Sequence, residues 1–215
     1  MNIKTYILNM PQRLERREAI AREFLGRRIF DVEFCEPVHH VNPRISHWLT
    51  MQRLAERAMA QQRPCFLFCE DDHIFTEAYS DQLLTSCIRE ADTLGADLLL
   101  GSVSWMLSPI QIRQSLFWLE SFNGTQFVIV FNRFYERIVN FHLHANDTVT
   151  EMNLVALSHG NIFTIHPFIS VQQEFGYSDV TPRNGQKGYV EGLFRNTQRE
   201  LYCLDKVKMF YAGLQ

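Results

Sequence analysis

Long apolar runs are missing from this sequence of 215 residues. No run approaches the roughly 18 residues that a membrane-spanning helix needs, and the opening MNIKTYILNM lacks the apolar stretch of a signal peptide. Paired cysteine motifs are missing too: the five cysteines include no CxxC pair, and Cys65 and Cys69 flank an apolar run, as buried thiols in a reducing compartment do. We therefore expect a cytoplasmic location, no transmembrane segment, and at most a peripheral contact at the inner face of the membrane.

An excess of positive charge is also missing. The formal net charge is −3 and the isoelectric point about 6.2, which argues against a general basic face for nucleic acid. The segment 13–28 is rich in arginine, but glutamates interleave with it, a pattern typical of a solvated, salt-bridged helix face. We expect no nucleic-acid partner.

Three common catalytic motifs are absent: the glycine-rich phosphate loop, the nucleophile elbow and HExxH. Their absence argues against a serine hydrolase and against a Walker-type nucleotide hydrolase. The chemistry of this chain must therefore come from another arrangement of side chains.

Short apolar segments alternate with amphipathic ones through the first half of the chain. The patterns predict strands at 4–9, 29–34, 65–69, 97–103, 116–120, 126–131 and 161–165. They predict helices at 13–25, 45–62, 79–94, 133–143 and 147–158. This order predicts an α/β three-layer sandwich with a mainly parallel central sheet, over residues 1–181. The stretch 182–215 has no clear period, and we expect a C-terminal extension that forms a lid, an extra hairpin or a partly ordered tail.

Three consecutive acids follow the apolar strand at 65–69. Glu70, Asp71 and Asp72 repel one another, and partial desolvation at the end of a buried strand adds to the cost unless a cation is present. In such sheets ligands bind beyond the carboxyl ends of the strands. Mn²⁺ or Mg²⁺ takes oxygen ligands and bridges carboxylates to substrate phosphates. The alternative is a solvated acidic turn in which Asp71 or Asp72 caps the next helix.

Several short motifs stand in a recognisable order over residues 6–180. They are Ile7-Leu8-Asn9-Met10 with Arg13, Arg16 and Arg17; Ser46-His47, with Ser46 as the expected N-cap of a helix; Phe66-Leu67-Phe68-Cys69-Glu70-Asp71-Asp72; Gly124-Thr125-Gln126-Phe127-Val128-Ile129; Asp147; and Pro167, Gln172 or Gln173, and Ser178-Asp179. Together they resemble glycosyltransferase family 25, which includes bacterial lipooligosaccharide galactosyltransferases and collagen galactosyltransferases.

The resemblance implies a GT-A-like fold, a UDP-sugar donor and inversion at the anomeric carbon. It implies a hexosyltransferase that moves a sugar, galactose in the family, to a glycan or a lipid-linked saccharide such as a lipooligosaccharide. A divalent ion, Mn²⁺ or Mg²⁺, would stabilise the charge that develops on the departing diphosphate.

Each motif residue receives an expected role on this reading. Glu70 and Asp72 are the candidate metal ligands. Donor contacts are expected from Asn9, Arg13, Arg16, Ser46, His47, Asp71, Gln173 and Asp179, because arginine in particular pairs well with phosphate. Inversion needs a carboxylate that takes the acceptor proton, and the candidates are Asp147 and, one helical turn later, Glu151.

The chain departs from the family pattern at two places. The family has Gly-Cys shortly before Ser-His, where this chain has Asn42-Pro43-Arg44-Ile45, and the segment between Gly101 and Gly124, with Trp105, is divergent. The second departure leaves the acceptor open. Two other readings stay open: a non-catalytic binding module of glycosyltransferase type, and a metal-dependent phosphohydrolase or nucleotidyltransferase built around the same acids.

Overall fold

The computed structural model describes residues 1–143, 149–178 and 182–213. Its strands are β1 (Ile3–Leu8), β2 (Phe30–Cys35), β3 (Cys65–Glu70), β4 (His73–Phe75), β5 (Leu98–Leu100), β6 (Trp105–Leu107), β7 (Ile110–Arg113), β8 (Leu116–Trp118), β9 (Ser121–Asn123), β10 (Phe127–Phe131), β11 (Ile162–Ile165) and β12 (Ser170–Gln172). Its helices are α1 (Leu14–Phe24), α2 (Pro43–Ala60), α3 (Asp81–Thr93), α4 (Asn132–Val139), α5 (Thr150–Ser158), the 3-10 turn η1 (Pro182–Gly185) and α6 (Tyr189–Tyr211). The expected strands and helices through residue 165 are found, and the short strands β4, β6, β7, β9 and β12 are additional.

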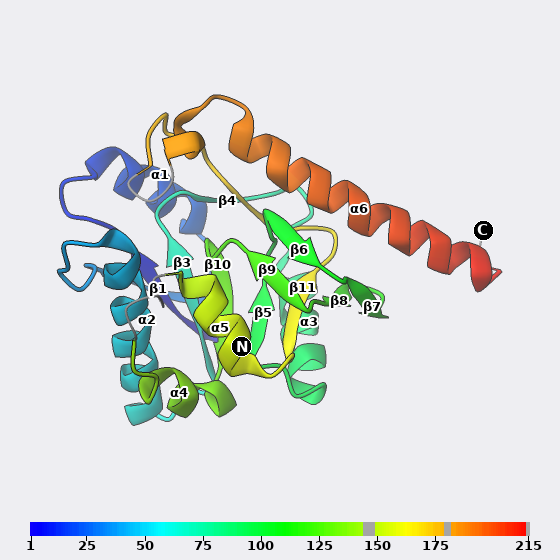
Figure 1. Cartoon of the computed structure of the whole chain (residues 1–215), viewed down its shortest axis with the longest axis horizontal. Helices are drawn as coiled ribbons and strands as arrows, with labels where there is room; N and C mark the ends of the chain where they lie inside the picture. Colours follow the sequence, from blue (N-terminus) through cyan, green and yellow to red (C-terminus); the bar gives the residue numbers. More distant parts are fainter. Residues whose placement is uncertain (144–148, 179–181, 214–215) are drawn as a thin grey trace.

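Eight strands form one sheet in the order β2-β1-β3-β10-β5-β11-β8-β7 (Figure 1). The pairings β1–β2, β1–β3 and β5–β11 are parallel, whereas β10 runs antiparallel to both β3 and β5, and β8 antiparallel to both β11 and β7. All the strands of this sheet except β10 and β8 therefore point the same way. The predicted α/β class with a mainly parallel sheet is confirmed.

Helices cover both faces of the sheet and create two cores. In β3, every residue from Cys65 to Cys69 is buried, and alternate side chains point to opposite faces. Phe66 and Phe68 pack in the core that includes buried residues of α2, α4, α5 and α6. Leu67 and Cys69 pack in the other core, which includes buried residues of α1 and α3. Because β3 is buried on both faces, only the residues at its carboxyl end are accessible to a ligand.

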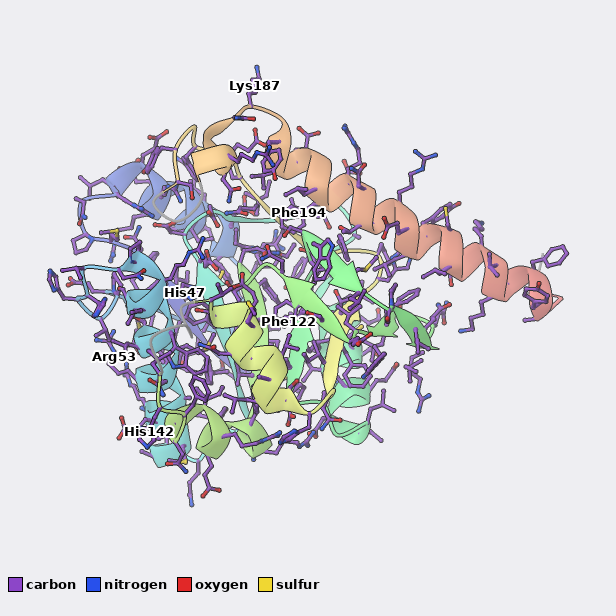
Figure 2. All side chains as sticks on the ribbon, viewed as in Figure 1. His47, Arg53, Phe122, His142, Lys187 and Phe194 are labelled. Atoms are coloured by element: carbon purple, nitrogen blue, oxygen red, sulfur yellow. The ribbon has the colours of Figure 1, made fainter. Side chains whose placement is uncertain are left out.

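The C-terminal stretch forms η1 and the 23-residue helix α6, a regular element where a lid, a hairpin or a tail was expected. The first half of α6 belongs to the protein core through Val190, Phe194 and Leu201 (Figure 2 labels Phe194). The second half extends past the edge of the sheet, where β7 lies (Figure 1). Among the described helices, none combines the length and apolar character needed to cross a membrane.

Candidate functional site

A pocket of about 750 Å³ opens at the carboxyl ends of β1 and β3, the edge of the sheet where the acids were expected to bind a ligand. Its walls come from the segments that follow β1 and β3, from α2, from the amino ends of β10 and α5, and from the chain after β12 together with the start of α6. Glu70, Asp71 and Asp72 all line it. The volume lies in the range of small-molecule and cofactor sites.

Side chains from the β1–α1 segment hold the Asp71 carboxylate. Asn9 Nδ2 donates a hydrogen bond of 2.9 Å to Asp71 Oδ2, and Arg16 Nη1 donates one of 3.1 Å to Oδ1. Arg13 Nη1 lies 3.8 Å from Oδ2. Because β1 and β3 are parallel neighbours, with Leu8 opposite Glu70, residues that follow the two strands meet at one edge. The three residues predicted to contact the nucleotide are thus gathered around Asp71, and of them Arg13 and Arg16 line the pocket.

The neighbouring Asp72 carboxylate is only half satisfied. Gln172 Nε2 donates a 2.6 Å hydrogen bond to Oδ2, and Arg16 Nη1 lies 3.4 Å from that same oxygen. Oδ1 is buried without a hydrogen-bond partner among the described residues. Burial, reinforced by the negative charge of Glu70, raises the pKa of Asp72 to about 7. This carboxylate therefore has an unused oxygen and a shortage of positive charge.

Aromatic side chains after β12 enclose Arg16, a contact that the sequence motifs did not predict. The Arg16 guanidinium lies 4.5 Å from the centre of the Tyr177 ring and 4.6 Å from that of Phe175. Arg16 also donates hydrogen bonds to the Tyr177 hydroxyl at 3.2 Å and to the Tyr177 carbonyl at 3.0 Å. At 5% exposure Arg16 is buried, so it acts as a fixed cation between Asp71 and Asp72.

Glu70 is held from the opposite side of the pocket. Thr125 Oγ1 donates a 2.5 Å hydrogen bond to Glu70 Oε1, and His47 Nε2 lies 3.4 Å from the same oxygen. Burial opposes ionisation of Glu70, but His47 and Thr125 outweigh it and lower the pKa below its ordinary value. Thr125 stands two residues before the start of the reversed strand β10, which is why it reaches an edge built otherwise from carboxyl ends. It belongs to the Gly-Thr motif but was not predicted as a site residue.

His47 connects α2 with α5 (Figure 2). Its Nδ1 atom lies 2.9 Å from Thr150 Oγ1, in the first turn of α5. Burial favours the neutral ring, but the charges of Glu70, Glu151 and Asp72 prevail and raise the pKa of His47 above its ordinary value. Positive charge on the His47 ring is therefore favoured in a pocket lined by Glu70, Asp71, Asp72, Glu151 and Glu174.

Ser46 was expected to cap α2, and this expectation is wrong. The N-cap is Asn42, whose Oδ1 accepts a 3.0 Å hydrogen bond from the Arg44 amide, with Pro43 at the first helical position. Ser46 lies one turn later and donates a 2.5 Å hydrogen bond to the Val38 carbonyl. It still lines the pocket, and its contact with a donor stays a prediction.

The remaining predicted site residues fall into two groups. Glu151 and Gln173 line the pocket: Glu151 Oε1 accepts a 3.4 Å hydrogen bond from the Gly124 amide, and the Gln173 amide donates one of 2.6 Å to the Asp72 carbonyl. Asp147 and Asp179 lie outside the described residues. Helix α5, predicted from 147, is described from Thr150 onward.

Within the described residues, no three side chains of histidine, cysteine, aspartate or glutamate gather as a ready-made metal cage. Magnesium, however, is commonly held by one or two carboxylates together with substrate phosphates. The Asp72 carboxylate fits that second arrangement, because the residue lines the pocket and its Oδ1 atom has no hydrogen-bond partner among the described residues. Asp71 is less suited, because Asn9 and Arg16 occupy both of its oxygens.

No protein-family model matches the sequence, and no curated protein matches it. Among solved structures, the chain is similar to a UDP-glucose pyrophosphorylase complexed with UDP-glucose, at 8% identity and a TM-score of 0.49 over 93% of this chain and 100% of that one. It is also similar to a glycosyltransferase involved in glycosylation of the major capsid of PBCV-1, at 12% identity and a TM-score of 0.43 over 78% and 94%. A third is a putative glucose-1-phosphate thymidylyltransferase from Bacillus anthracis, at 10% identity and a TM-score of 0.44 over 90% and 75%. These likenesses concern the path of the chain, so the side chains of the pocket have to support any functional conclusion.

Proposed function

We propose that this chain is an inverting glycosyltransferase of the family 25 type, with a GT-A-like fold. It moves a sugar, galactose by the resemblance, from a UDP-sugar to a glycan or a lipid-linked saccharide in the cytoplasm. The observation that carries the proposal is the cluster of buried Asp71, Asp72 and Arg16 with partly buried Glu70 and His47, in a pocket of about 750 Å³. A nucleoside diphosphate complements such a pocket, because it brings negative charge to fixed cations and phosphate oxygens for a metal ion.

Asp72 would hold the metal ion through Oδ1, with Glu70 beside it as a second carboxylate. Mn²⁺ or Mg²⁺ bound there would supply Lewis-acid stabilisation of negative charge on the departing diphosphate. The chain's own cations add to that stabilisation: Arg13 lines the pocket, Arg16 is fixed by Tyr177 and Phe175, and His47 has a raised pKa. Because these groups are already oriented, they need no reorganisation when charge develops.

Transfer with inversion requires an acceptor hydroxyl to attack the anomeric carbon as the bond to the diphosphate breaks. The hydroxyl proton passes to a carboxylate, and the nucleoside diphosphate leaves with the electron pair of the broken bond. We assign the proton acceptor to Glu151, at the start of α5, because it lines the pocket and is oriented by the Gly124 amide. Asp147 is the second candidate base.

Thermal unfolding in the presence of UDP, GDP, ADP or CMP, each with and without Mn²⁺, tests the donor assignment. A ligand at 100 times its dissociation constant stabilises a one-site protein by about 2.7 kcal/mol, which for a chain of this size is a shift of roughly 5–10 °C. We expect the largest shift with UDP and Mn²⁺ together. Folded protein that responds to none of the nucleotides would contradict a catalytic role and favour the binding module.

Product analysis separates the remaining enzyme readings. A glycosyltransferase releases UDP from a UDP-sugar at a rate that depends on the acceptor. A phosphohydrolase would release nucleotide at the same rate with any acceptor. A nucleotidyltransferase would instead join a nucleoside triphosphate to a sugar phosphate and release pyrophosphate.

A further inference from the structure

The outer face of the small β6–β9 sheet exposes a tryptophan. Trp105 and Asn123 are cross-strand partners, so their side chains lie on the same face, together with Leu107. Trp105 is 50% exposed and Leu107 44%. The other face carries Met106 and Phe122, which are buried in the core beneath (Figure 2 labels Phe122). Single exposed apolar residues are common, but here two of them alternate along one strand face.

This face continues directly into the pocket. Asn123 and Ser104 both line the pocket, and Ser104 Oγ donates a 2.9 Å hydrogen bond to Asn123 Oδ1 that fixes the amide. The residue after Asn123 is Gly124, whose amide orients Glu151. The small sheet contacts α5 through β9 and α6 through β6, and it lies between these two helices (Figure 1). Trp105 therefore stands beside the pocket, next to the side where the proposed base is found.

We infer that this face, which we call the Trp105 platform (Trp105, Leu107, Ser121 and Asn123), binds the acceptor saccharide. The inference rests on the proposed function. The apolar face of a pyranose ring packs on an aromatic ring, while its hydroxyl groups need hydrogen-bond partners at the edge, which Asn123 and Ser121 supply. The platform arises from the segment between Gly101 and Gly124, the divergent part of the family resemblance. That origin fits a surface that determines which acceptor is used.

Intrinsic fluorescence can observe this surface directly. Of the three tryptophans, Trp48 is fully buried and Trp118 is partly buried, with its indole N–H bonded to the Gly160 carbonyl. Iodide in solution will therefore quench Trp105 preferentially. A panel of soluble di-, tri- and tetrasaccharides containing galactose, glucose and N-acetylglucosamine supplies the probes. We expect one or more of them to protect Trp105 from iodide.

Substitution completes the test. Trp105→Ala should weaken saccharide binding and raise the acceptor KM by roughly tenfold, and Trp105→Phe should restore part of both, with the UDP-dependent thermal shift unchanged. The exposed Leu25→Ala, far from the platform, serves as the control. A UDP response without saccharide protection, or an unchanged acceptor KM in Trp105→Ala, overturns the platform and leaves the proposed function standing. Protection without any UDP response supports the platform and refutes the transferase.

A second surface arises independently at the free end of α6. Leu204, Val207, Phe210 and Tyr211 are all exposed, and their spacing of three and four residues places them on one side of the helix. Asp205, on another side, accepts a hydrogen bond of 2.8 Å from Gln111 Nε2, which ties the helix to the body. The four apolar residues therefore form a stripe that points away from the protein.

The charged residues around this stripe indicate what kind of surface it binds. Lys206 and Lys208 are exposed and flank the stripe on its two sides, whereas the acid Glu200 lies one turn before Leu204 and marks where the stripe begins. Two copies of the helix packed along this stripe would bring their lysines together, which like charge disfavours. The geometry points to the surface of an anionic membrane, where apolar side chains enter the interface and lysines reach lipid headgroups.

Vesicle flotation tests the α6 stripe. The protein should float with vesicles of phosphatidylcholine mixed with phosphatidylglycerol and stay behind with phosphatidylcholine alone. Phe210→Ser should abolish flotation, Lys206→Gln with Lys208→Gln should reduce it severalfold, and the exposed Arg195→Gln, outside the stripe, should behave as wild type. Failure of the wild-type protein to float overturns the proposal. Sedimentation as a dimer that Phe210→Ser converts to a monomer would assign the stripe to a second copy instead.

Discussion

Gln172 Nε2 donates a 2.6 Å hydrogen bond to Asp72 Oδ2, while the Oδ1 atom of the same carboxylate is buried and unpartnered among the described residues. A buried charge that is only half satisfied destabilises the folded chain. If Asp72 binds a metal ion as proposed, stability is exchanged for binding at this position.

Asp72→Asn should therefore stabilise the protein in the absence of ligand. The folded pKa, about 7, lies above the ordinary 3.8, so this carboxyl costs stability progressively as pH rises from about 3.8 to about 7, and the cost is complete above 7. The gain should be greatest at alkaline pH, up to ~4 kcal/mol, and should disappear in acid. Urea unfolding at several pH values measures it. The same variant should lose the Mn²⁺-dependent response to UDP, and a variant less stable than wild type at alkaline pH would contradict the argument.

The ion pair between His47 and Glu70 should stabilise the fold within a limited range of pH. The pKa of His47 is raised, so its contribution is complete below the ordinary 6.5 and is lost as pH rises through the folded value. The pKa of Glu70 is lowered, so its contribution is complete above 4.5 and is lost as pH falls through the folded value. Both act together between those limits. His47→Gln should lower the melting temperature more at about pH 5.5 than at about pH 8.5, and an equal loss at both would argue against a charged His47.

Glu151→Gln should separate chemistry from binding. If Glu151 accepts the acceptor proton, the amide should lower kcat by roughly 100-fold or more, because it keeps the shape of the side chain but removes the base. The thermal shift with UDP and Mn²⁺ should not change. Glu136→Gln, an exposed acid on α4, is the matched control. Full activity in Glu151→Gln would transfer the role to Asp147.

Arg16→Ala should destabilise the fold by about 3 kcal/mol or more, because it leaves the buried carboxylates of Asp71 and Asp72 without their shared cation. Arg16→Lys should recover only part of the loss, since an ammonium group cannot also stack on Tyr177 and bond to its hydroxyl and carbonyl. Denaturant unfolding of both variants beside the exposed Arg22→Ala measures the effect. Equal stability of Arg16→Ala and Arg22→Ala would show that Arg16 contributes no more than a surface charge.

Local patterns in the sequence were sufficient for the elements that hold the acids. Five apolar residues in a row defined β3, and the acids after it marked the pocket edge. The helix α6 was missed, although its buried residues Val190, Phe194, Thr197 and Leu201 follow helical spacing, because Gly192 and a mixed polar surface weaken the pattern. That spacing could have revealed it.

Other features could not be read from local sequence at all. Gln172 reaches Asp72 because β12 pairs with β4, with Gln172 opposite His73, and a pairing between segments 100 residues apart has no local signature. The antiparallel direction of β10 also could not be predicted from local sequence. The segment 126–131 has the composition of any buried strand, and composition does not give direction.

The three residues before β10 restrict how the length of this chain can change. The backbone of Gly124 has a φ of +115°. Thr125 donates a hydrogen bond to Glu70, and Gln126 Nε2 donates one of 2.7 Å to Ser102 Oγ. Each of the three positions is therefore restricted in a different way. One inserted residue here would exchange the directions of Thr125 and Gln126 and remove a partner of Glu70. The turns that join β6 to β7 and β7 to β8 contribute no residue to the pocket. Relatives of this chain should therefore vary by insertion and deletion in these turns and keep a fixed length from Gly124 to Phe127, so that the proposed acceptor side diversifies while the proposed donor side stays unchanged.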